Sequence, residues 1–406
     1  MARTRSVRLT SAAAERVIDR LQQFSIEVPS WGFANTGTRF GKFLQDAAAV
    51  DLEDKIADAG ITHKYTGITP TVAVHVLWDF PNGFDPAVAG LARKHGVRIG
   101  SINANIFQDQ CYKYGSITNR DPAIRKRALD HIVDSIDIGR AAKSEYLVVW
   151  AADGANYPGQ ADVRQRKHWA TAAFRKAHAA MPTGMTMLIE YKPFEPATYL
   201  TDVFDWGSTY IFAKAAGPRA KVLVDTGHHL PSCNIEQIVA WLIDEKMLGG
   251  FHFNDRKYAD DDLTVGSIDP YQVFRIFNEI AAYEWQTHGD LKIAYMIDQA
   301  ESIKPKVQAI IQSVCNAQEL FARALCVDRK ALAAAQAKED TIKAEQTLLA
   351  AFQADVRPIL KGVRKRLGAP TDPLAAFRAS GYEEAAAKER SRKRKALGIA
   401  EGASYA

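Results

Sequence analysis

Acidic and imidazole side chains follow several short apolar runs in the second half of the chain. Glu190 ends the run MTMLIE, Asp225 ends VLVD, His252 lies within GFHFN, and Asp298 ends LKIAYMID. Three carboxylates and one imidazole suit Mn²⁺, Mg²⁺ or Co²⁺ better than a metal that selects thiolates. Because an isolated buried aspartate is costly unless it is paired or metal-bound, the set predicts a divalent-metal site.

A second group of ligand-type residues lies close by in the sequence. His228 comes three residues after Asp225, and Asp260 and Asp262 form a D-x-D pair whose side chains project the same way if the loop is extended. Asp225 could then bridge two metals, an arrangement that polarises adjacent substrate oxygens. Any one of these residues could instead be a solvated loop acid or a core histidine, but the whole set on adjacent strands argues against that interpretation.

A lysine and three tryptophans complete the candidate site. Lys192 comes two residues after Glu190, so it points the same way along the strand and could hold an oxyanion or a hydroxyl. A surface salt bridge is the alternative role for this lysine. Trp31, Trp78 and Trp150 stand at predicted strand ends. An apolar wall opposite acids is typical of a sugar pocket.

Eight strand-then-helix units must position these side chains. The predicted strands are 26–33, 71–77, 97–104, 146–150, 185–190, 222–225, 250–254 and 291–298, and the predicted helices are 52–59, 86–95, 121–143, 162–180, 204–216, 235–246, 271–282 and 304–325. Strict alternation implies parallel strands, and eight units predict an α/β fold, the closed (β/α)8 TIM barrel, with its site at the C-terminal ends of the strands. An open doubly wound sheet is the alternative, but no G-x-G-x-x-G follows the first strand.

The ends of the chain add helices to this barrel. We expect residues 1–325 to form the barrel with an N-terminal helix capped by Thr10 or Ser11, and 326–406 to form a helical extension covering the barrel or a neighbouring subunit. The basic run ERSRKRKAL is interpreted as a solvated helix face, because acids alternate with its bases.

The composition of the chain limits the binding partners and the cellular compartment that we expect. The net charge of +5 is concentrated near the end of the chain, which argues against a nucleic-acid surface. There is no apolar leader, no apolar run approaching ~18 residues, and no pairing pattern among the four cysteines. We therefore expect a cytoplasmic protein with no membrane partner.

Taken together, the motifs resemble the xylose isomerase-like TIM barrels, and within them the broad-specificity L-rhamnose isomerases. The motifs are LIEYK, VDTGHH, FHFNDRKYADDD, YMIDQAE, HVLWD and SWGF, with Trp150, and they extend from about Ser30 to Glu301. The resemblance implies a structural metal held by Glu190, Asp225, His252 and Asp298. It implies a catalytic metal held by Asp225, His228, Asp260 and Asp262, with Mn²⁺ foremost and Co²⁺, Mg²⁺ or Zn²⁺ as alternatives.

The resemblance also implies a substrate and a reaction. The sugar would contact Trp31, His75, Trp78, Trp150, Glu190 and Lys192, with Phe40 supplied by a neighbouring subunit of a homotetramer. The expected reaction interconverts L-rhamnose and L-rhamnulose, and also D-allose and D-psicose. Lys192 and the metals would stabilise charge on the carbonyl oxygen, and the hydrogen would move between C1 and C2 by a hydride shift or through an enediol. A water held by Asp298 or Asp262, beside the metal that His228 binds, would carry the hydroxyl proton.

Three other functions fit parts of this pattern less well. A ketose 3-epimerase on the same barrel needs one metal and a glutamate where this chain has Asp298, so His228 and the D-x-D pair favour an isomerase. A metal-dependent nuclease would need more histidines and a basic groove. A non-catalytic sugar-binding protein would not need seven convergent ligands.

Overall fold

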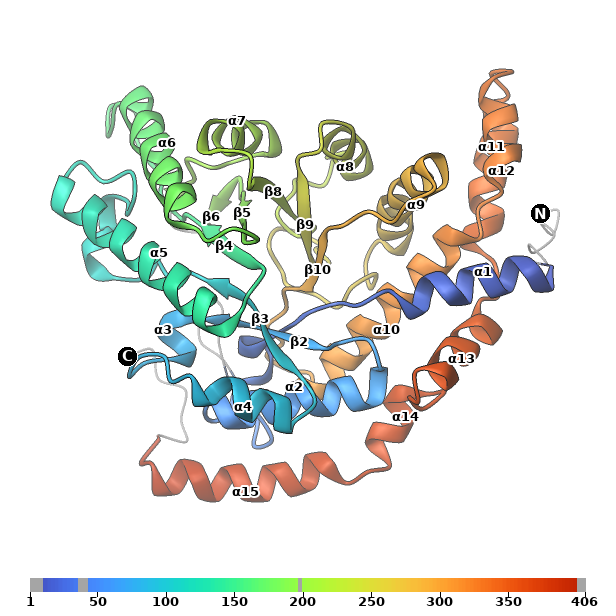
Figure 1. Ribbon diagram of the computed structural model, residues 1–406, viewed down its shortest axis with the longest axis horizontal. Coiled ribbons are helices and arrows are strands. Elements are labelled where there is room, and N and C mark those ends of the chain that lie inside the picture. The colour runs from blue at the N-terminus through green and yellow to red at the C-terminus, as the bar shows by residue number, and fades with distance from the viewer. Residues whose placement is uncertain (1–9, 36–42, 196–198, 400–406) are drawn as a thin grey trace.

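A sheet of eight parallel strands forms the centre of the molecule (Figure 1). The computed structural model describes residues 10–35, 43–195 and 199–399. The strands of this sheet, in order, are β1 (Val28–Pro29), β2 (Thr71–His75), β3 (Arg98–Asn103), β4 (Tyr146–Trp150), β5 (Thr186–Glu190), β8 (Ala220–Asp225), β9 (Leu248–Phe253) and β10 (Ala294–Ile297). Glu27, just before β1, pairs with Met296 of β10, which brings the first strand against the last.

A ring of helices surrounds the strands (Figure 1). The helices that follow the strands are α2 (Leu52–Thr66), α4 (Ala87–Lys94), α5 (Pro122–Ala142), α6 (Val163–Ala180), α7 (Trp206–Ala216), α8 (Ile235–Asp244), α9 (Pro270–Thr287) and α10 (Lys306–Leu325). The helix α1 (Ser11–Gln22) precedes them, and the Thr10 side chain accepts a hydrogen bond from Ala13 at its start. This arrangement confirms the predicted (β/α)8 barrel.

The inside of the barrel has an apolar layer beneath a polar one. Val148, Leu188, Leu223 and Met296 pack together inside the barrel, apart from the larger core between strands and helices. Each lies two residues before Trp150, Glu190, Asp225 or Asp298, and residues two apart on a strand share a face. The apolar layer therefore supports the candidate site at the C-terminal ends of the strands.

Two predicted strands end earlier than expected. The first was predicted to run to residue 33, but Ser30–Phe33 forms a 3₁₀ helix, η1, so Trp31 lies in a helical turn. The second was predicted to run to residue 77, but Val76–Asp79 forms the short helix α3, which contains Trp78. Both turns are held by Asp79, whose Oδ2 accepts hydrogen bonds from the Ser30 hydroxyl (2.6 Å) and the His75 N–H (2.8 Å).

Other predicted boundaries also shift. The helix predicted at 52–59 continues to Thr66 and ends at Gly67, whose φ of 75° suits a glycine cap. The strand predicted at 291–298 begins only at Ala294. A small antiparallel hairpin, β6 (Phe194–Glu195) with β7 (Tyr199–Leu200), was not predicted and follows β5 above the barrel.

The C-terminal segment forms further helices outside the barrel. They are α11 (Arg329–Gln336), α12 (Thr341–Phe352), α13 (Arg357–Arg366), α14 (Pro373–Arg378) and α15 (Tyr382–Ala396). Helix α13 packs on α1, and α14 packs on α2 and α10. The division at residues 325 and 326 stays a prediction. In the described part of the chain, no helix is long and apolar enough to cross a membrane.

The prediction that the basic run of α15 is a solvated face is wrong for two of its residues. Arg390 and Arg394 are buried. Arg390 pairs with Asp58 of α2 at 2.8 Å, and Arg394 donates to the carbonyl of Asp46 at 2.8 Å. Two basic residues of this run, Arg390 and Arg394, therefore hold α15 against the barrel.

Candidate metal centre

Four ligand-type side chains converge at the C-terminal end of the barrel. Glu190 ends β5, Asp225 ends β8, His252 lies near the end of β9, and Asp298 directly follows β10. Their ligand atoms all lie within 4.8 Å of one another. His252 Nδ1 is 3.2 Å from Glu190 Oε1, 3.5 Å from Asp298 Oδ2 and 3.8 Å from Asp225 Oδ2. The strand register causes this convergence, because Asp225 pairs with His252, which pairs with Met296.

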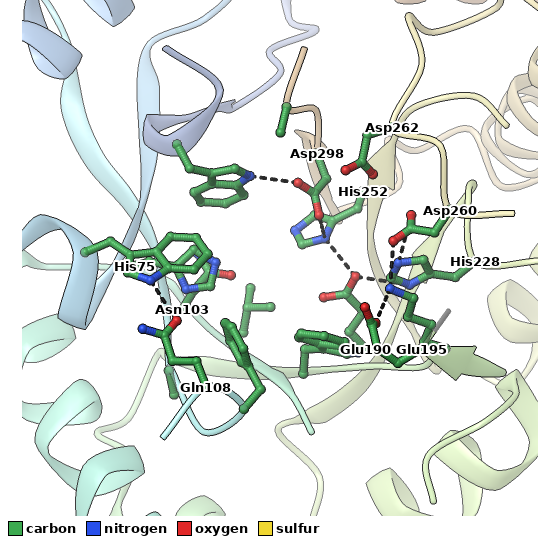
Figure 2. A pocket seen from close by; sticks show the side chains of 18 residues that line it. His75, Asn103, Gln108, Glu190, Glu195, His228, His252, Asp260, Asp262 and Asp298 are labelled. Carbon is green, nitrogen blue, oxygen red and sulfur yellow. Dashed lines mark hydrogen bonds and ion pairs between the residues drawn. The ribbon is translucent and has the colours of Figure 1, made fainter. Parts of the chain in front are cut away.

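A second group shares Asp225 with the first. Ligand atoms of Asp225, His228 and Asp260 also lie within 4.8 Å of one another. His228 Nδ1 is 2.9 Å from the Tyr191 carbonyl, which leaves Nε2 facing Asp260 Oδ1 at 3.3 Å and Asp225 Oδ2 at 3.9 Å. Figure 2 shows His228 and Asp260 beside Glu190 on the same side of the cavity.

Asp262 lies at the cavity but outside the tighter second group. It lines the same cavity as His228 and Asp260. Its φ is 50°, so the D-x-D segment is not the extended loop that the sequence suggested. Burial and the neighbouring Asp260 carboxylate raise the pKa of Asp262 well above its usual range.

The charge balance of the site fits a divalent cation. Burial and nearby carboxylates raise the pKa of Asp225 to about 7 and also raise the pKa of Asp298. Burial lowers the pKa of His228, but the carboxylates of Asp225 and Asp260 outweigh it and raise the value to about 9. The pKa of His252 rises to about 10 because Glu190 and Asp298 likewise outweigh its burial. Such an excess of buried acid favours bound positive charge, and oxygen-rich sites with imidazole suit the metals predicted above.

Backbone and side-chain hydrogen bonds orient the shared aspartate. Asp225 Oδ1 accepts hydrogen bonds from the Gly227 N–H at 2.7 Å and from the Asn254 amide at 3.1 Å. The Arg256 guanidinium donates to the carbonyls of Thr226 and His229, which fixes the turn between Asp225 and His228. These bonds leave Oδ2 of Asp225 as the atom that faces both imidazoles.

Lys192 is a buried cation at the wall of the cavity. Only 3% of its side chain is exposed, and Nζ is 2.6 Å from Glu195 and 2.7 Å from Asp260. The ammonium also lies 5.0 Å from the centre of the Trp150 ring. The alternative of a surface salt bridge is therefore wrong for this lysine.

An aromatic wall faces the acids across the cavity. The ring of His75 lies 4.6 Å from that of Trp31 and 4.1 Å from that of Trp78, and Phe107 lies 4.8 Å from Trp150. The indole N–H of Trp31 donates to Asp298 Oδ1 at 2.9 Å, which joins the wall to the first ligand group. The cavity has a volume of about 420 Å³. Figure 2 shows the carboxylates on one side and His75 with Gln108 on the other.

The cavity brings together most of the predicted site residues, and it is also lined by residues that were not predicted. Of the residues predicted for the site, the cavity is lined by Trp31, His75, Trp78, Trp150, Glu190, Lys192, His228, His252, Asp260, Asp262 and Asp298. Asp225 is fully buried and is not among the lining residues, and Phe40 lies outside the described residues. The missed lining residues are Asn103, Ala104, Phe107, Gln108, Val148, Glu195 and Ala300. Phe107 and Gln108 follow the third strand, so the rule that found the ligands at other strand ends could have found them.

Two kinds of solved structure show the same fold. An L-ribulose 3-epimerase matches with a TM-score of 0.53 and 13% identity, over 79% of this chain and 98% of its own. A D-allulose 3-epimerase from Methylomonas sp., solved with D-allulose, matches with a TM-score of 0.50 and 17% identity, over 74% and 95%. At these identities the likeness concerns the fold alone.

Sequence relatives extend over nearly the whole chain. A probable sugar isomerase of Mesorhizobium japonicum is 40% identical over 93% of this chain and 89% of its own length. A probable sugar isomerase of Rhizobium meliloti is 39% identical over 91% and 87%. A xylose isomerase of Thermus thermophilus is 27% identical over 48% of this chain and 53% of its own. The family model described as xylose isomerase-like TIM barrel matches residues 56–288, and the chain belongs to this family.

Proposed function

We propose that the protein is an aldose–ketose isomerase that uses two divalent metal ions, with Mn²⁺ foremost. The observation that carries this proposal is the pair of ligand groups that share Asp225 and face an aromatic wall across one cavity. Two probable sugar isomerases that match nearly the whole chain support it. We propose L-rhamnose and L-rhamnulose as one substrate pair, and D-allose and D-psicose as another.

The chain's own residues suit each part of this reaction. Bound metal ions would polarise two adjacent sugar oxygens. Lys192, held by Glu195 and Asp260, places a positive charge where it can stabilise the substrate's carbonyl oxygen. Asp262 lines the cavity, where its carboxylate can take up the hydroxyl proton of the sugar. The indoles and Phe107 pack against the C–H faces of the sugar and exclude water.

The principal alternative is a ketose 3-epimerase, because two of the structural neighbours are named as 3-epimerases. Those neighbours share only the fold with this chain. The second ligand group, with His228 and Asp260 beside the shared Asp225, supports an isomerase with two metals.

We propose that the enzyme forms a homotetramer. We also propose that it accepts several sugars. The metals and Lys192 would fix only the first carbons of the sugar. Beyond them the wall is mostly aromatic, and one methyl or hydroxyl in such surroundings changes binding by only about 1–3 kcal/mol. Sugars that differ at the far carbons should therefore share the site.

A panel of aldoses with Mn²⁺ tests this function, with products separated by chromatography. We expect L-rhamnose and D-allose both to give their C1–C2 ketose isomers. Conversion of a single aldose, with the others inert, would contradict the breadth. With a ketose such as D-psicose as the substrate in the same assay, a product epimerised at C3 and no aldose would show that the epimerase is the correct function.

A further inference from the structure

One buried guanidinium ties together three loops at the C-terminal end of the barrel. Arg166 lies in the first turn of α6, and 4% of its side chain is exposed. Its Nε is 2.9 Å from Asp202 Oδ2, while its two Nη groups donate to the carbonyls of Tyr114 and Gly154, each at 3.1 Å. These partners lie in the loops after β5, β3 and β4. Because the guanidinium is a rigid fork of donors, one side chain can fix all three loops.

A buried aspartate completes this connection. Asp153 in the β4 loop accepts hydrogen bonds of 2.7 Å from both the N–H and the hydroxyl of Ser116 and of Thr118. The Thr118 hydroxyl also lies 2.9 Å from Asp202 Oδ2. Gly115 has a φ of 107°, and a Cβ there would lie 3.1 Å from Arg166 Nη2. The β3 loop therefore fits closely against the guanidinium.

The segment that Arg166 holds also holds the backbone of Lys192. The Lys192 N–H donates to the Val203 carbonyl at 3.0 Å, and the Thr201 hydroxyl donates to the Lys192 carbonyl. Asp202 lies between these two residues, and its own N–H donates to the Asp153 carbonyl at 2.6 Å. A shift of Asp202 would therefore move the peptide groups on both sides of Lys192.

We propose that Arg166 is a positioning residue, which acts through Asp202 to fix Lys192 over the cavity. The proposal rests on the proposed function, in which the Lys192 ammonium stabilises charge on the substrate. Arg166 itself is not among the residues that line the cavity. Misplacing a reacting group by about 1 Å can cost on the order of 100-fold in rate. The guanidinium is thus expected to affect turnover without touching the sugar.

The test compares Arg166→Ala and Arg166→Lys with Arg164→Ala in the full chain loaded with Mn²⁺. Arg164 lies on the same helix turn but is exposed, so its loss should leave turnover unchanged. We expect Arg166→Ala to lower kcat by about tenfold to 100-fold. The amount of bound Mn²⁺ should stay the same, because no candidate ligand contacts Arg166. Arg166→Lys keeps the pair with Asp202 but cannot reach both carbonyls, so it should fold and show an intermediate kcat.

Two further measurements separate positioning from a general structural role. Added guanidinium ion, well below denaturing concentrations, should restore part of kcat to Arg166→Ala. In a Lys192→Met background, Arg166→Ala should lower kcat no further, because the group it positions is already gone. Wild-type kcat in both Arg166 variants, or equal losses with and without Lys192, would overturn the proposal.

A readout independent of activity separates this proposal from the proposed function. If the wild type converts no sugar in the panel, the proposed function fails. The positioning role of Arg166 is then tested by acetylating Lys192 with an amine-reactive reagent and measuring the labelled peptide by mass spectrometry. We expect severalfold faster labelling of Lys192 in Arg166→Lys and Arg166→Ala than in Arg164→Ala. Equal labelling would overturn the positioning role.

Discussion

At the scale of single residues, the candidate centre depends on carboxylates that lie close enough to repel one another. Asp262 is well suited to a substitution test, because it lines the cavity and its backbone has a φ of 50°. Asparagine adopts this conformation readily, so Asp262→Asn should leave the loop in place while removing the charge. We expect kcat to fall by about 100-fold or more, with the far-ultraviolet circular dichroism unchanged.

Asp261→Asn is the matched control for this substitution. The Asp261 carboxylate accepts hydrogen bonds from the backbone N–H groups of Lys257 and Tyr258 and so caps the loop. An amide oxygen can make the same bonds, so this variant should keep nearly wild-type kcat. If Asp262→Asn keeps most of its kcat, Asp262 has no part in proton transfer or metal binding.

Residue types at strand ends were predictable, but their conformations and partners were not. Glu190, Asp225 and Asp298 follow from apolar runs that end in acids, because parallel strands deliver such residues to one face. The D-x-D pattern does not predict the positive φ of Asp262. Glu195 was missed because its role depends on the unpredicted hairpin that brings it to 2.6 Å from Lys192.

At the scale of elements, α15 is held to the barrel by a buried ion pair. Arg390 contacts Asp58 of α2 at 2.8 and 2.9 Å, and the Tyr382 hydroxyl donates to the same carboxylate at 2.8 Å. Asp58 is fully buried. Arg390→Ala would leave this carboxylate without its cation, so we expect it to lower the free energy of unfolding by about 3–5 kcal/mol. Denaturant unfolding of the purified variant measures the loss.

Arg392→Ala is the control on the same helix, because Arg392 is exposed. It should change the unfolding midpoint little. Residual kcat per folded molecule should be unchanged in both variants, since α15 contributes no residue to the cavity. Equal midpoints for the two variants would show that the Arg390 pair does not stabilise the docked helix.

The order of elements could be predicted from periodicity, but docking over long sequence distances could not. Eight alternating strand and helix patterns were enough to predict the barrel, because few architectures have that count. The partner of Arg390 lies 332 residues earlier in the chain. An alternating run of acids and bases is typical of a solvated helix, so only the packed structure reveals that Arg390 and Arg394 face inward.

At the scale of the whole molecule, the barrel gathers ligands from four strands onto one end. The family of the chain and the cavity of about 420 Å³ agree with the proposed reaction, and the two ligand groups support the proposal that it requires metal. Because Asp225 belongs to both groups, occupancy of one site should influence the other. Turnover should therefore depend on how many ions each chain holds.

The most direct measurement is a titration of metal-stripped protein with Mn²⁺, following bound ions per chain and turnover of L-rhamnose together. We predict no turnover after chelation and full turnover only when two ions are bound per chain. Equal turnover in chelated and untreated protein would contradict the metal requirement, and full turnover with one ion per chain would contradict the two-metal centre.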